Sequence, residues 1–194
     1  MQIAEAIAAV DRRQFLPPDV ANTPDIEDVP VPFGNGQTVP TALMTELFIK
    51  LADLHPFDVV MEVGTGSGYQ AAILSKLVKE VHTFEVRDIP ACLSQRLPDN
   101  VTIYHRDAVS DVSDIDFVAD AILVTCAIPG PYRVWKKLLR NGGVLVAPLR
   151  GTGEICKYVK DGLYFRDIGP FAYANFVTVE SPSSESGVID EQGL

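Results

Sequence analysis

The fold is decided by the stretch Val59-Val60-Met61-Glu62-Val63-Gly64-Thr65-Gly66-Ser67-Gly68. Its first half is an almost unbroken apolar run, which is typical of a strand covered on both faces of a parallel sheet. Three glycines end the run, and apolar residues at helical spacing follow at 69–78. Glycines let the chain turn sharply and let a ligand press against bare backbone, and a helix start offers free N–H groups to an anionic group. The stretch therefore predicts a ligand-binding turn between a strand and a helix.

The glycine spacing distinguishes this turn from two common nucleotide-binding loops. A dinucleotide-binding turn reads Gly-x-Gly-x-x-Gly, whereas this one reads Gly-x-Gly-x-Gly. No Gly-Lys-Ser or Gly-Lys-Thr follows it, so the pattern does not indicate a P-loop. A tight strand–helix turn that binds no ligand stays open as the alternative.

The chain after the glycines alternates short strands with helices. Strands are expected at 81–86, 101–105, 121–125, 144–148, 155–160 and 175–179, and helices near 89–97 and 131–140. The second of these helices is expected to end at Asn141-Gly142-Gly143, a C-cap signal. This alternation predicts an α/β fold with a doubly wound, mostly parallel sheet in a single domain.

The chain before the glycines has two helical patterns separated by a long stretch of helix and strand breakers. Apolar spacing predicts helices near 3–10 and 43–54. Between them, residues 17–42 contain six prolines and two glycines, so we expect no regular structure there. An irregular stretch of this length in a compact domain is usually functional or disordered.

Composition limits the class of protein. The chain has 194 residues and a net charge of −10, with a pI near 4.7. Nucleic acids and anionic lipids both need clustered Lys and Arg, so neither is expected as a partner. No apolar run reaches the ~18 residues of a membrane span, no signal-peptide pattern is present, and the three cysteines suggest neither disulfides nor a metal site. We expect a cytoplasmic monomer.

Two acidic residues stand at the ends of later strands. Glu85 lies 21 residues after Gly64, the spacing at which an acid on the second strand reaches ribose hydroxyls. Asp107 follows the strand at 101–105, where its carboxylate can accept from an adenine amine. Singly, either acid is more often a solvated strand-end charge. Together with the glycine turn, at the crevice where α/β sheets bind ligands, they predict an adenosine-containing cofactor.

The sequence resembles the protein-L-isoaspartate (D-aspartate) O-methyltransferase family. The motifs that carry the resemblance are 62–72, Arg13-Gln14-Phe15-Leu16-Pro17, 31–38, 124–129, 139–143 and 167–170, in the order that the family shows. They cover roughly residues 3–180. The resemblance implies a Rossmann-like class I methyltransferase that uses S-adenosyl-L-methionine. It places Gly64, Thr65, Gly66 and Ser67 at the methionine part, Glu85 at the ribose and Asp107 at the adenine, with Glu62 and Gly68 completing the cofactor-binding set.

The resemblance also divides the chain. Residues 1–180 are expected to form the methyltransferase domain, in which 1–56 are an N-terminal helical and substrate-loop segment and 57–180 are the cofactor-binding α/β core. Residues 181–194 contain few apolar residues, so we expect a flexible tail.

One position departs from the family pattern. The family has Ser-x-Pro after its Gln-Thr-Ile/Val, and the serine lies beside the substrate carboxylate. This chain has Pro40-Thr41-Ala42 instead, and proline offers neither a hydroxyl nor a backbone N–H. Thr38 and Thr41 are the candidate catalytic residues that could supply a hydroxyl, but turn-stabilising threonines are equally consistent with the pattern.

The chemistry implied by the resemblance needs no general base. A carboxylate acceptor is already an ionised nucleophile at neutral pH, whereas an alcohol or amine usually needs a base such as His. His55 and His82 are expected at the wrong strand ends, and His105 on the adenine side.

The sequence thus favours an isoaspartyl-repair carboxyl O-methyltransferase that acts on peptides or proteins. A diverged member with a different carboxylate or small-molecule acceptor, and a non-catalytic cofactor-binding module, are the alternatives.

Overall fold

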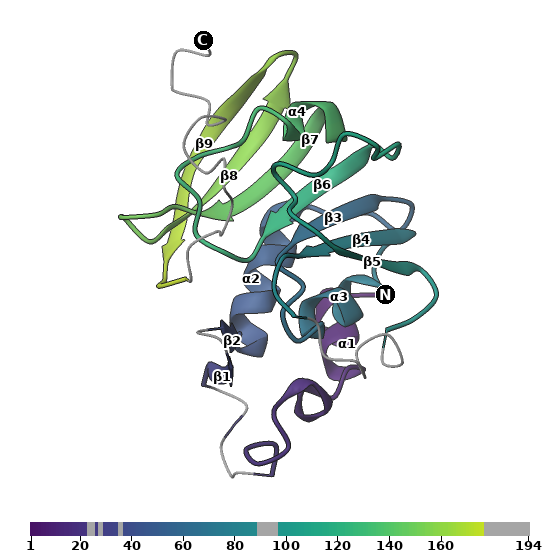
Figure 1. Cartoon of the computed structure of the whole chain (residues 1–194), viewed down its shortest axis with the longest axis vertical. Helices are drawn as coiled ribbons and strands as arrows, with labels where there is room; N and C mark the ends of the chain where they lie inside the picture. The colour runs from purple at the N-terminus through teal and green to yellow at the C-terminus, as the bar shows by residue number, and fades with distance from the viewer. Residues whose placement is uncertain (23–25, 27–28, 35–36, 89–96, 177–194) are drawn as a thin grey trace.

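The computed structural model describes residues 1–22, 26, 29–34, 37–88 and 97–176, and it is built on one large sheet (Figure 1). Seven strands form this sheet. In their order across it they are β5 (Val101–His105), β4 (Glu80–Glu85), β3 (Val59–Val63), β6 (Ala119–Val124), β7 (Leu139–Pro148), β8 (Glu154–Asp161) and β9 (Tyr164–Tyr173).

The sheet is parallel from β5 to β7, while β8 and β9 pair antiparallel. This confirms the mostly parallel α/β fold that the sequence predicts. From β3 the chain continues outward to β4 and β5 on one side, and β6 and β7 then extend the sheet on the other. The strand order therefore reverses between β3 and β6, and α/β folds bind ligands beyond the carboxyl ends of the strands at such a point.

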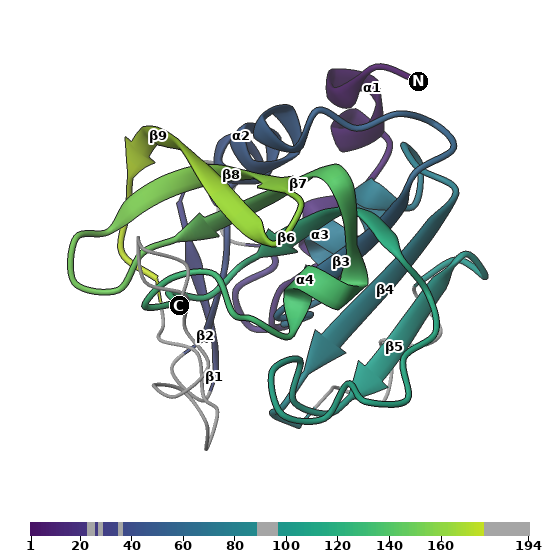
Figure 2. The same ribbon diagram turned by 90° about the horizontal axis from the view of Figure 1, so that it is seen from above.

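Helices cover both faces of the sheet (Figure 2). One core contains residues of α1 (Ile3–Ala8), α2 (Ala42–Ala52) and α3 (Tyr69–Leu74), and the opposite core contains Trp135 and Leu138 of α4 (Trp135–Leu138). The central strands β3 and β6 are buried on both sides; in β3, Val60 and Met61 are each 0% exposed. Burial on both faces explains why the β3 sequence is apolar throughout instead of alternating.

The proline-rich stretch is more regular than expected. It contains an antiparallel hairpin of β1 (Val31–Gly34) and β2 (Gln37–Val39). A short 3₁₀ helix at Arg12–Phe15 precedes it. Val31 and Val39 pair and are both buried, so two apolar anchors hold the hairpin on the core. The expectation of no regular structure was wrong because a two-stranded hairpin tolerates proline on its edges.

The sequence was also wrong about the end of α4. The expected helix over 131–140 is only one turn long, and β7 begins at Leu139 and runs through the glycines that were expected to cap the helix. The Lys160 ammonium of β8 donates instead to the main-chain carbonyls of Lys136 and Leu139. A cation from the neighbouring strand β8 thus supplies hydrogen bonds to carbonyls at the end of α4, in place of a C-cap residue.

The last strand lies earlier than expected. β9 ends at Tyr173, and residues 174–176 are not in a strand. Most β9 side chains are exposed on both faces, so the strand lacks the apolar alternation by which strands are recognised. The rest of the strand expected at 175–179, the helix expected near 89–97 except for Leu97, and the tail at 181–194 lie outside the described residues.

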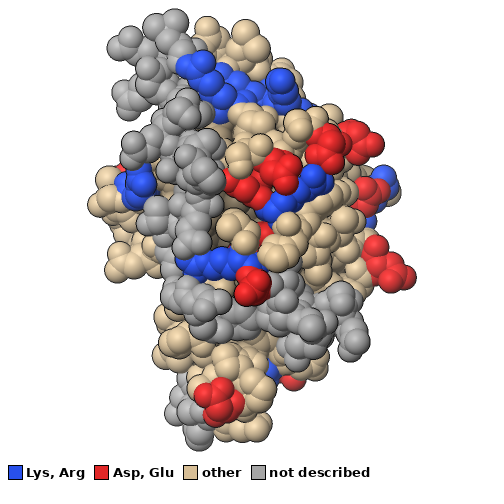
Figure 3. All heavy atoms as spheres, viewed as in Figure 1, with Lys and Arg blue, Asp and Glu red and all other residues tan. Residues whose placement is uncertain are grey.

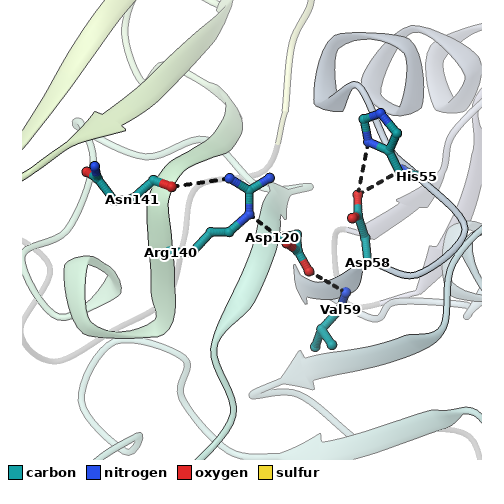
Figure 4. Close-up of polar contacts among 6 residues, drawn as sticks. All are labelled: His55, Asp58, Val59, Asp120, Arg140 and Asn141. Carbon is teal, nitrogen blue, oxygen red and sulfur yellow. Dashed lines mark hydrogen bonds and ion pairs between the residues drawn. The ribbon is translucent and has the colours of Figure 1, made fainter.

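The amino ends of the central strands are joined by side chains (Figure 4). The two carboxylate oxygens of Asp120 accept from the Val59 backbone N–H at 2.8 Å and from Arg140 Nε at 2.6 Å. Asp120 therefore links β6 to β3 and to β7, at the end of the sheet opposite the glycine turn. Among the described residues, no helix is both long and apolar enough to cross a membrane.

Candidate active site

A cavity of about 410 Å³ opens beyond the carboxyl ends of β3, β4, β5 and β6. Its floor is the glycine turn with the residues that follow those strands, and the hairpin side contributes Pro30, Gln37, Thr38, Pro40 and Thr41. The sheet therefore places one continuous hollow between the predicted cofactor residues and the proline-rich segment.

The glycine turn is fixed to the neighbouring strand. Gly64 and Thr65 both donate backbone N–H bonds to the Phe84 carbonyl, at 2.8 and 3.1 Å. Gly64 has φ +99°, and a Cβ there would lie 2.3 Å from Thr125 Oγ1. Gly66 has φ +53°, and a Cβ there would meet nothing within 4 Å, although the residue lines the cavity. Gly64 is thus needed for packing, and Gly66 leaves bare backbone beside the hollow.

A chain of polar side chains lies under the turn. The Thr83 hydroxyl donates to Glu62 Oε2 at 2.6 Å and lies 2.7 Å from Thr65 Oγ1. Glu62 is 0% exposed, and burial raises its pKa to about 8, although the nearby side chains of Thr83 and Gln70 lower it in part. Within the described part of the chain, neither Glu62 Oε1 nor Gln70 Nε2 has a hydrogen-bond partner, and both residues line the cavity. Buried polar atoms without partners are rare, so this pair points to a polar ligand.

Glu85 ends β4 and is buried against the turn. Its Oε2 accepts from Gly66 N at 2.9 Å and from Gln37 Nε2 at 3.4 Å, and its Oε1 accepts from Arg87 N at 3.0 Å. A carboxylate offers about four acceptor positions, so these bonds leave capacity for a ligand hydroxyl. Through Gln37, Glu85 also touches the hairpin.

Asp107 follows β5 and lines the same cavity. Its two oxygens accept from Val109 N and from Ser110 Oγ, both at 2.7 Å, which fixes the carboxylate in a tight turn. The indole N–H of Trp135 donates to the Ala108 carbonyl at 2.8 Å and holds this turn to α4. The structure therefore brings all eight predicted cofactor residues to one region, and seven of them line the cavity: Glu62, Gly64, Thr65, Gly66, Ser67, Glu85 and Asp107. Gly68 lies just beyond, at the start of α3.

Thr38 and Thr41 both line the hairpin side of the cavity with Pro40. Thr41 is the N-cap of α2, because its Oγ1 accepts from Met44 N at 3.1 Å, so the turn-stabilising alternative holds for this residue. That bond uses Oγ1 as an acceptor and leaves the hydroxyl proton for another partner. Thr38 is exposed on β2.

The other reactive side chains near the site are neutral or distant. His82 packs against the rings of Tyr104 and Phe117 on β4 and does not line the cavity. His55 pairs with Asp58 near the amino ends of the strands (Figure 4). Cys126 does line the cavity, but burial raises the pKa of its thiol to about 12, so it is not a thiolate at neutral pH.

The sequence profile of the protein-L-isoaspartate (D-aspartate) O-methyltransferase family matches residues 1–181. The chain belongs to this family. A protein-L-isoaspartate O-methyltransferase from Roseiflexus castenholzii is 36% identical over 155 residues, which are 77% of this chain and 70% of that protein. Another, from Ruegeria sp. strain TM1040, is 32% identical over 181 residues, which are 88% of this chain and 83% of that protein.

Solved structures agree on the fold. A protein-L-isoaspartate O-methyltransferase superimposes with a TM-score of 0.78 at 21% identity, covering 92% of this chain and 61% of the other. A Plasmodium falciparum structure described under the same enzyme name, and determined in complex with S-adenosyl-L-homocysteine, has a TM-score of 0.68 at 21% identity. It is covered over 99% of its chain and 93% of this one.

Three site residues of this methyltransferase were not singled out by the sequence patterns. Gln37 and Gln70 stand inside quoted family motifs, but nothing in the sequence shows that one reaches Glu85 and the other is buried beside Glu62. Arg12 stands next to Arg13 in a polar stretch that reads as solvated, yet it is 3% exposed. The hydrogen-bond partners of Arg12 are main-chain carbonyls on both sides of the hairpin, and only the folded path of the chain brings them together.

Proposed function

We propose that this chain is an S-adenosyl-L-methionine-dependent carboxyl O-methyltransferase of the isoaspartyl-repair type, acting on isoaspartyl carboxylates in peptides or proteins. One observation supports this proposal most strongly. A single cavity is lined both by Glu62 and Gln70, whose buried Oε1 and Nε2 atoms have no hydrogen-bond partner among the described residues, and by residues of the hairpin. When bound, the cofactor supplies a methyl group on a positively charged sulfur.

The residues present suit that cofactor. Glu62 Oε1 and Gln70 Nε2 match the ammonium and carboxylate of an amino acid, one as acceptor and the other as donor. Gly66 leaves backbone open to the hollow. Glu85 retains acceptor capacity, which we assign to the ribose hydroxyls, and we assign Asp107, which follows the next strand, to the adenine amine. Thr65, Ser67 and Gly68 shape the turn around the methionine part.

The acceptor side fits a carboxylate nucleophile. Such an acceptor is already ionised at neutral pH, so the protein has to orient it and exclude water. The Cys126 thiol agrees with this role, because burial raises its pKa to about 12 and it is therefore no base at pH 7. Glu62 is assigned to the ammonium of the cofactor, and that positive charge favours its ionised form. We propose the hydroxyls of Thr38 and Thr41 as donors to the carboxylate, in the absence of the family serine.

We also propose that residues 1–180 form one methyltransferase domain, with 1–56 carrying the substrate loop and 57–180 the cofactor core. We propose further that the chain is a cytoplasmic monomer and that it binds no nucleic acid. Its net charge of −10 opposes a polyanionic partner. On the face shown in Figure 3, acidic side chains lie between the basic ones near the middle of the molecule.

The decisive experiment compares an isoaspartyl peptide with its aspartyl twin. The purified chain with cofactor is expected to form base-labile methyl ester, read as released methanol, on the first peptide only. Glu85→Ala is expected to weaken cofactor binding by about 1–3 kcal/mol, the loss typical of a hydrogen bond to a charged group. Glu80→Ala is the matched control, because Glu80 lies at the opposite end of the same strand, does not line the cavity and pairs with Lys79. Equal methylation of both peptides, or of neither, would refute the proposal.

A further inference from the structure

The side chain of Arg12 is buried in the N-terminal segment and holds main-chain carbonyls. Its Nε donates to Pro40 O at 2.9 Å and its Nη1 to Ile26 O at 2.6 Å. Its Nη2 donates to Val29 O at 2.8 Å and to Val39 O at 3.2 Å. Among the described residues, one guanidinium therefore makes four hydrogen bonds to backbone that lies 14 to 28 residues away in the sequence.

These four carbonyls stand on both sides of the β1–β2 hairpin. Ile26 and Val29 precede β1, whereas Val39 ends β2 and Pro40 follows it. We call the two strands β1 and β2, together with Pro40 and Thr41, the acceptor wall. Arg12 closes the neck from which this wall extends, and it is not among the residues that line the cavity. Its effect on the cavity is therefore exerted through the wall.

The wall needs such a closure. An isolated two-stranded hairpin is marginally stable at best in water, and this one has strands of four and three residues. Ordering each backbone residue costs about 1–2 kcal/mol of conformational entropy, which a few hairpin bonds do not offset. Two buried valines and the 3.4 Å bond from Gln37 to Glu85 are the other described anchors.

The chemistry of the side chain suits the task. Arginine presents five N–H donors in a planar fork and stays charged at any physiological pH, so it can serve carbonyls in several directions at once. Lysine concentrates its charge on one flexible ammonium and has only three donors. A buried cation is costly unless it is hydrogen-bonded, and the four carbonyls contribute to that compensation.

We propose that Arg12 is the positioning residue of the methyl-acceptor site. By joining the carbonyls before β1 to those after β2, it fixes the acceptor wall, and with it Thr38, Pro40 and Thr41, at the mouth of the cofactor cavity. The identity of the methyl acceptor in this inference rests on the proposed function, whereas the fixing of the acceptor wall by Arg12 does not. Loss of Arg12 is therefore expected to act on acceptor binding and to spare cofactor binding.

The test compares three variants of the full-length chain. Arg12→Ala is expected to raise the KM for an isoaspartyl peptide by about 10-fold or more, with the Kd for S-adenosylmethionine changed by less than about 2-fold, because uniform substrate binding is what is lost. Arg12→Lys is expected to fall between Arg12→Ala and the parent. Arg13→Ala is the control, because the neighbouring Arg13 donates to Ala21 O, outside the acceptor wall. An unchanged peptide KM in Arg12→Ala, or an equal loss of cofactor affinity, would overturn the proposal.

A second measurement does not depend on activity. Amide hydrogen exchange at Gln37, Thr38, Val39 and Thr41 is expected to quicken in Arg12→Ala and to slow again when a few millimolar guanidinium chloride is added, whereas equal sodium chloride has no effect. Unchanged exchange would exclude the closure. If exchange is faster in Arg12→Ala but the parent chain methylates no isoaspartyl peptide, the role of Arg12 in fixing the wall stands and the proposed substrate is refuted. If Arg12→Ala does not fold, Arg12→Lys carries both measurements.

Discussion

Glu62 is a carboxyl group enclosed by the glycine turn and the two central strands. Its folded-state pKa is raised from 4.5 to about 8, so the folded chain binds this proton more tightly than the unfolded chain does. The contribution to stability is therefore fully present below pH 4.5 and is lost as pH rises through about 8. Burial of the charged form is the physical cause.

The first prediction concerns this proton. Between pH 5 and 8, the free energy of unfolding of the cofactor-free chain is expected to fall by up to about 1 kcal/mol per pH unit because of Glu62. Glu62→Gln is expected to remove that slope, and Glu46→Gln on the surface of α2 to keep it. Urea unfolding of the three proteins across this range provides the measurement. A parent slope that survives in Glu62→Gln would show that another group carries it.

Pro40 gives the second prediction at the same scale. Its carbonyl accepts from Arg12, a bond that any residue can make, while its ring removes both a hydroxyl and an N–H from the cavity side. Pro40→Ser is expected to raise kcat/KM on an isoaspartyl peptide by about 10-fold, which corresponds to one hydrogen bond of about 1.4 kcal/mol.

Pro40→Ala separates the two effects in that experiment, because it restores the N–H without the hydroxyl. A gain in Pro40→Ala equal to that in Pro40→Ser would assign the effect to the backbone. No gain in either variant would indicate that Thr38 and Thr41 already serve the carboxylate or that the acceptor is different.

At the scale of elements, the glycine turn separates packing from ligand space. A Cβ at Gly64 would overlap Thr125 Oγ1 at 2.3 Å, and that hydroxyl donates to the carbonyls of Val63 and Gly64, which join the ends of β3 and β6. A Cβ at Gly66 would meet no protein atom within 4 Å. The two glycines should therefore fail in different ways when they are replaced.

The third prediction follows from that contrast. Gly64→Ala is expected to lower the free energy of unfolding by about 2–4 kcal/mol through overpacking and the strained φ. Gly66→Ala is expected to cost only about 1–2 kcal/mol of stability, the usual penalty for a left-handed residue, but to weaken cofactor binding by at least 10-fold. Thermal unfolding and calorimetric titration separate the outcomes. Cofactor affinity that is unaffected by Gly66→Ala would exclude the turn from the cofactor site.

Elements that carry a clear apolar pattern could be predicted from the sequence, and elements without such a pattern could not. The strands at 59–63 and 101–105 lie where the sequence places them, and α2 begins within one residue of its expected start. β9 was missed because its residues are exposed on both faces, and α4 was overestimated because Lys160, distant in sequence, takes over its carbonyls. The hairpin was missed because its contacts come from Arg12, which bonds to the carbonyls beside it, and from two buried valines, none of which forms a local pattern.

At the scale of the whole molecule, the two ends of the parallel strands differ in what they carry. The cavity lies beyond the carboxyl ends of the parallel strands, and the Asp120 linkage lies at their amino ends (Figure 4). Asp120 joins three strands that are far apart in the chain, so its bonds form only when the sheet is assembled. Its contribution should appear in global stability and not at the site.

The fourth prediction tests this separation. Asp120→Ala is expected to lower the free energy of unfolding by about 1–2 kcal/mol, because the Val59 N–H and Arg140 Nε lose their partner near the surface. The Kd for S-adenosylmethionine is expected to stay the same. Glu46→Ala, which breaks the surface pair with Lys50, is the control and is expected to change stability by less than about 1 kcal/mol. Weaker cofactor binding in Asp120→Ala would show that the two ends of the sheet are coupled.

The division of the chain between its two walls has a consequence for how such a protein changes over generations. In the proposed arrangement, the methyl-donor side draws its residues from the ends of four strands and from α3, whereas the acceptor wall and Arg12 come from one continuous stretch, residues 12–41. A single recombination event, or a short run of substitutions, can therefore replace the acceptor side while the donor pocket is inherited intact. Pro40 stands within that exchangeable stretch, in a protein whose cofactor motif otherwise follows its family.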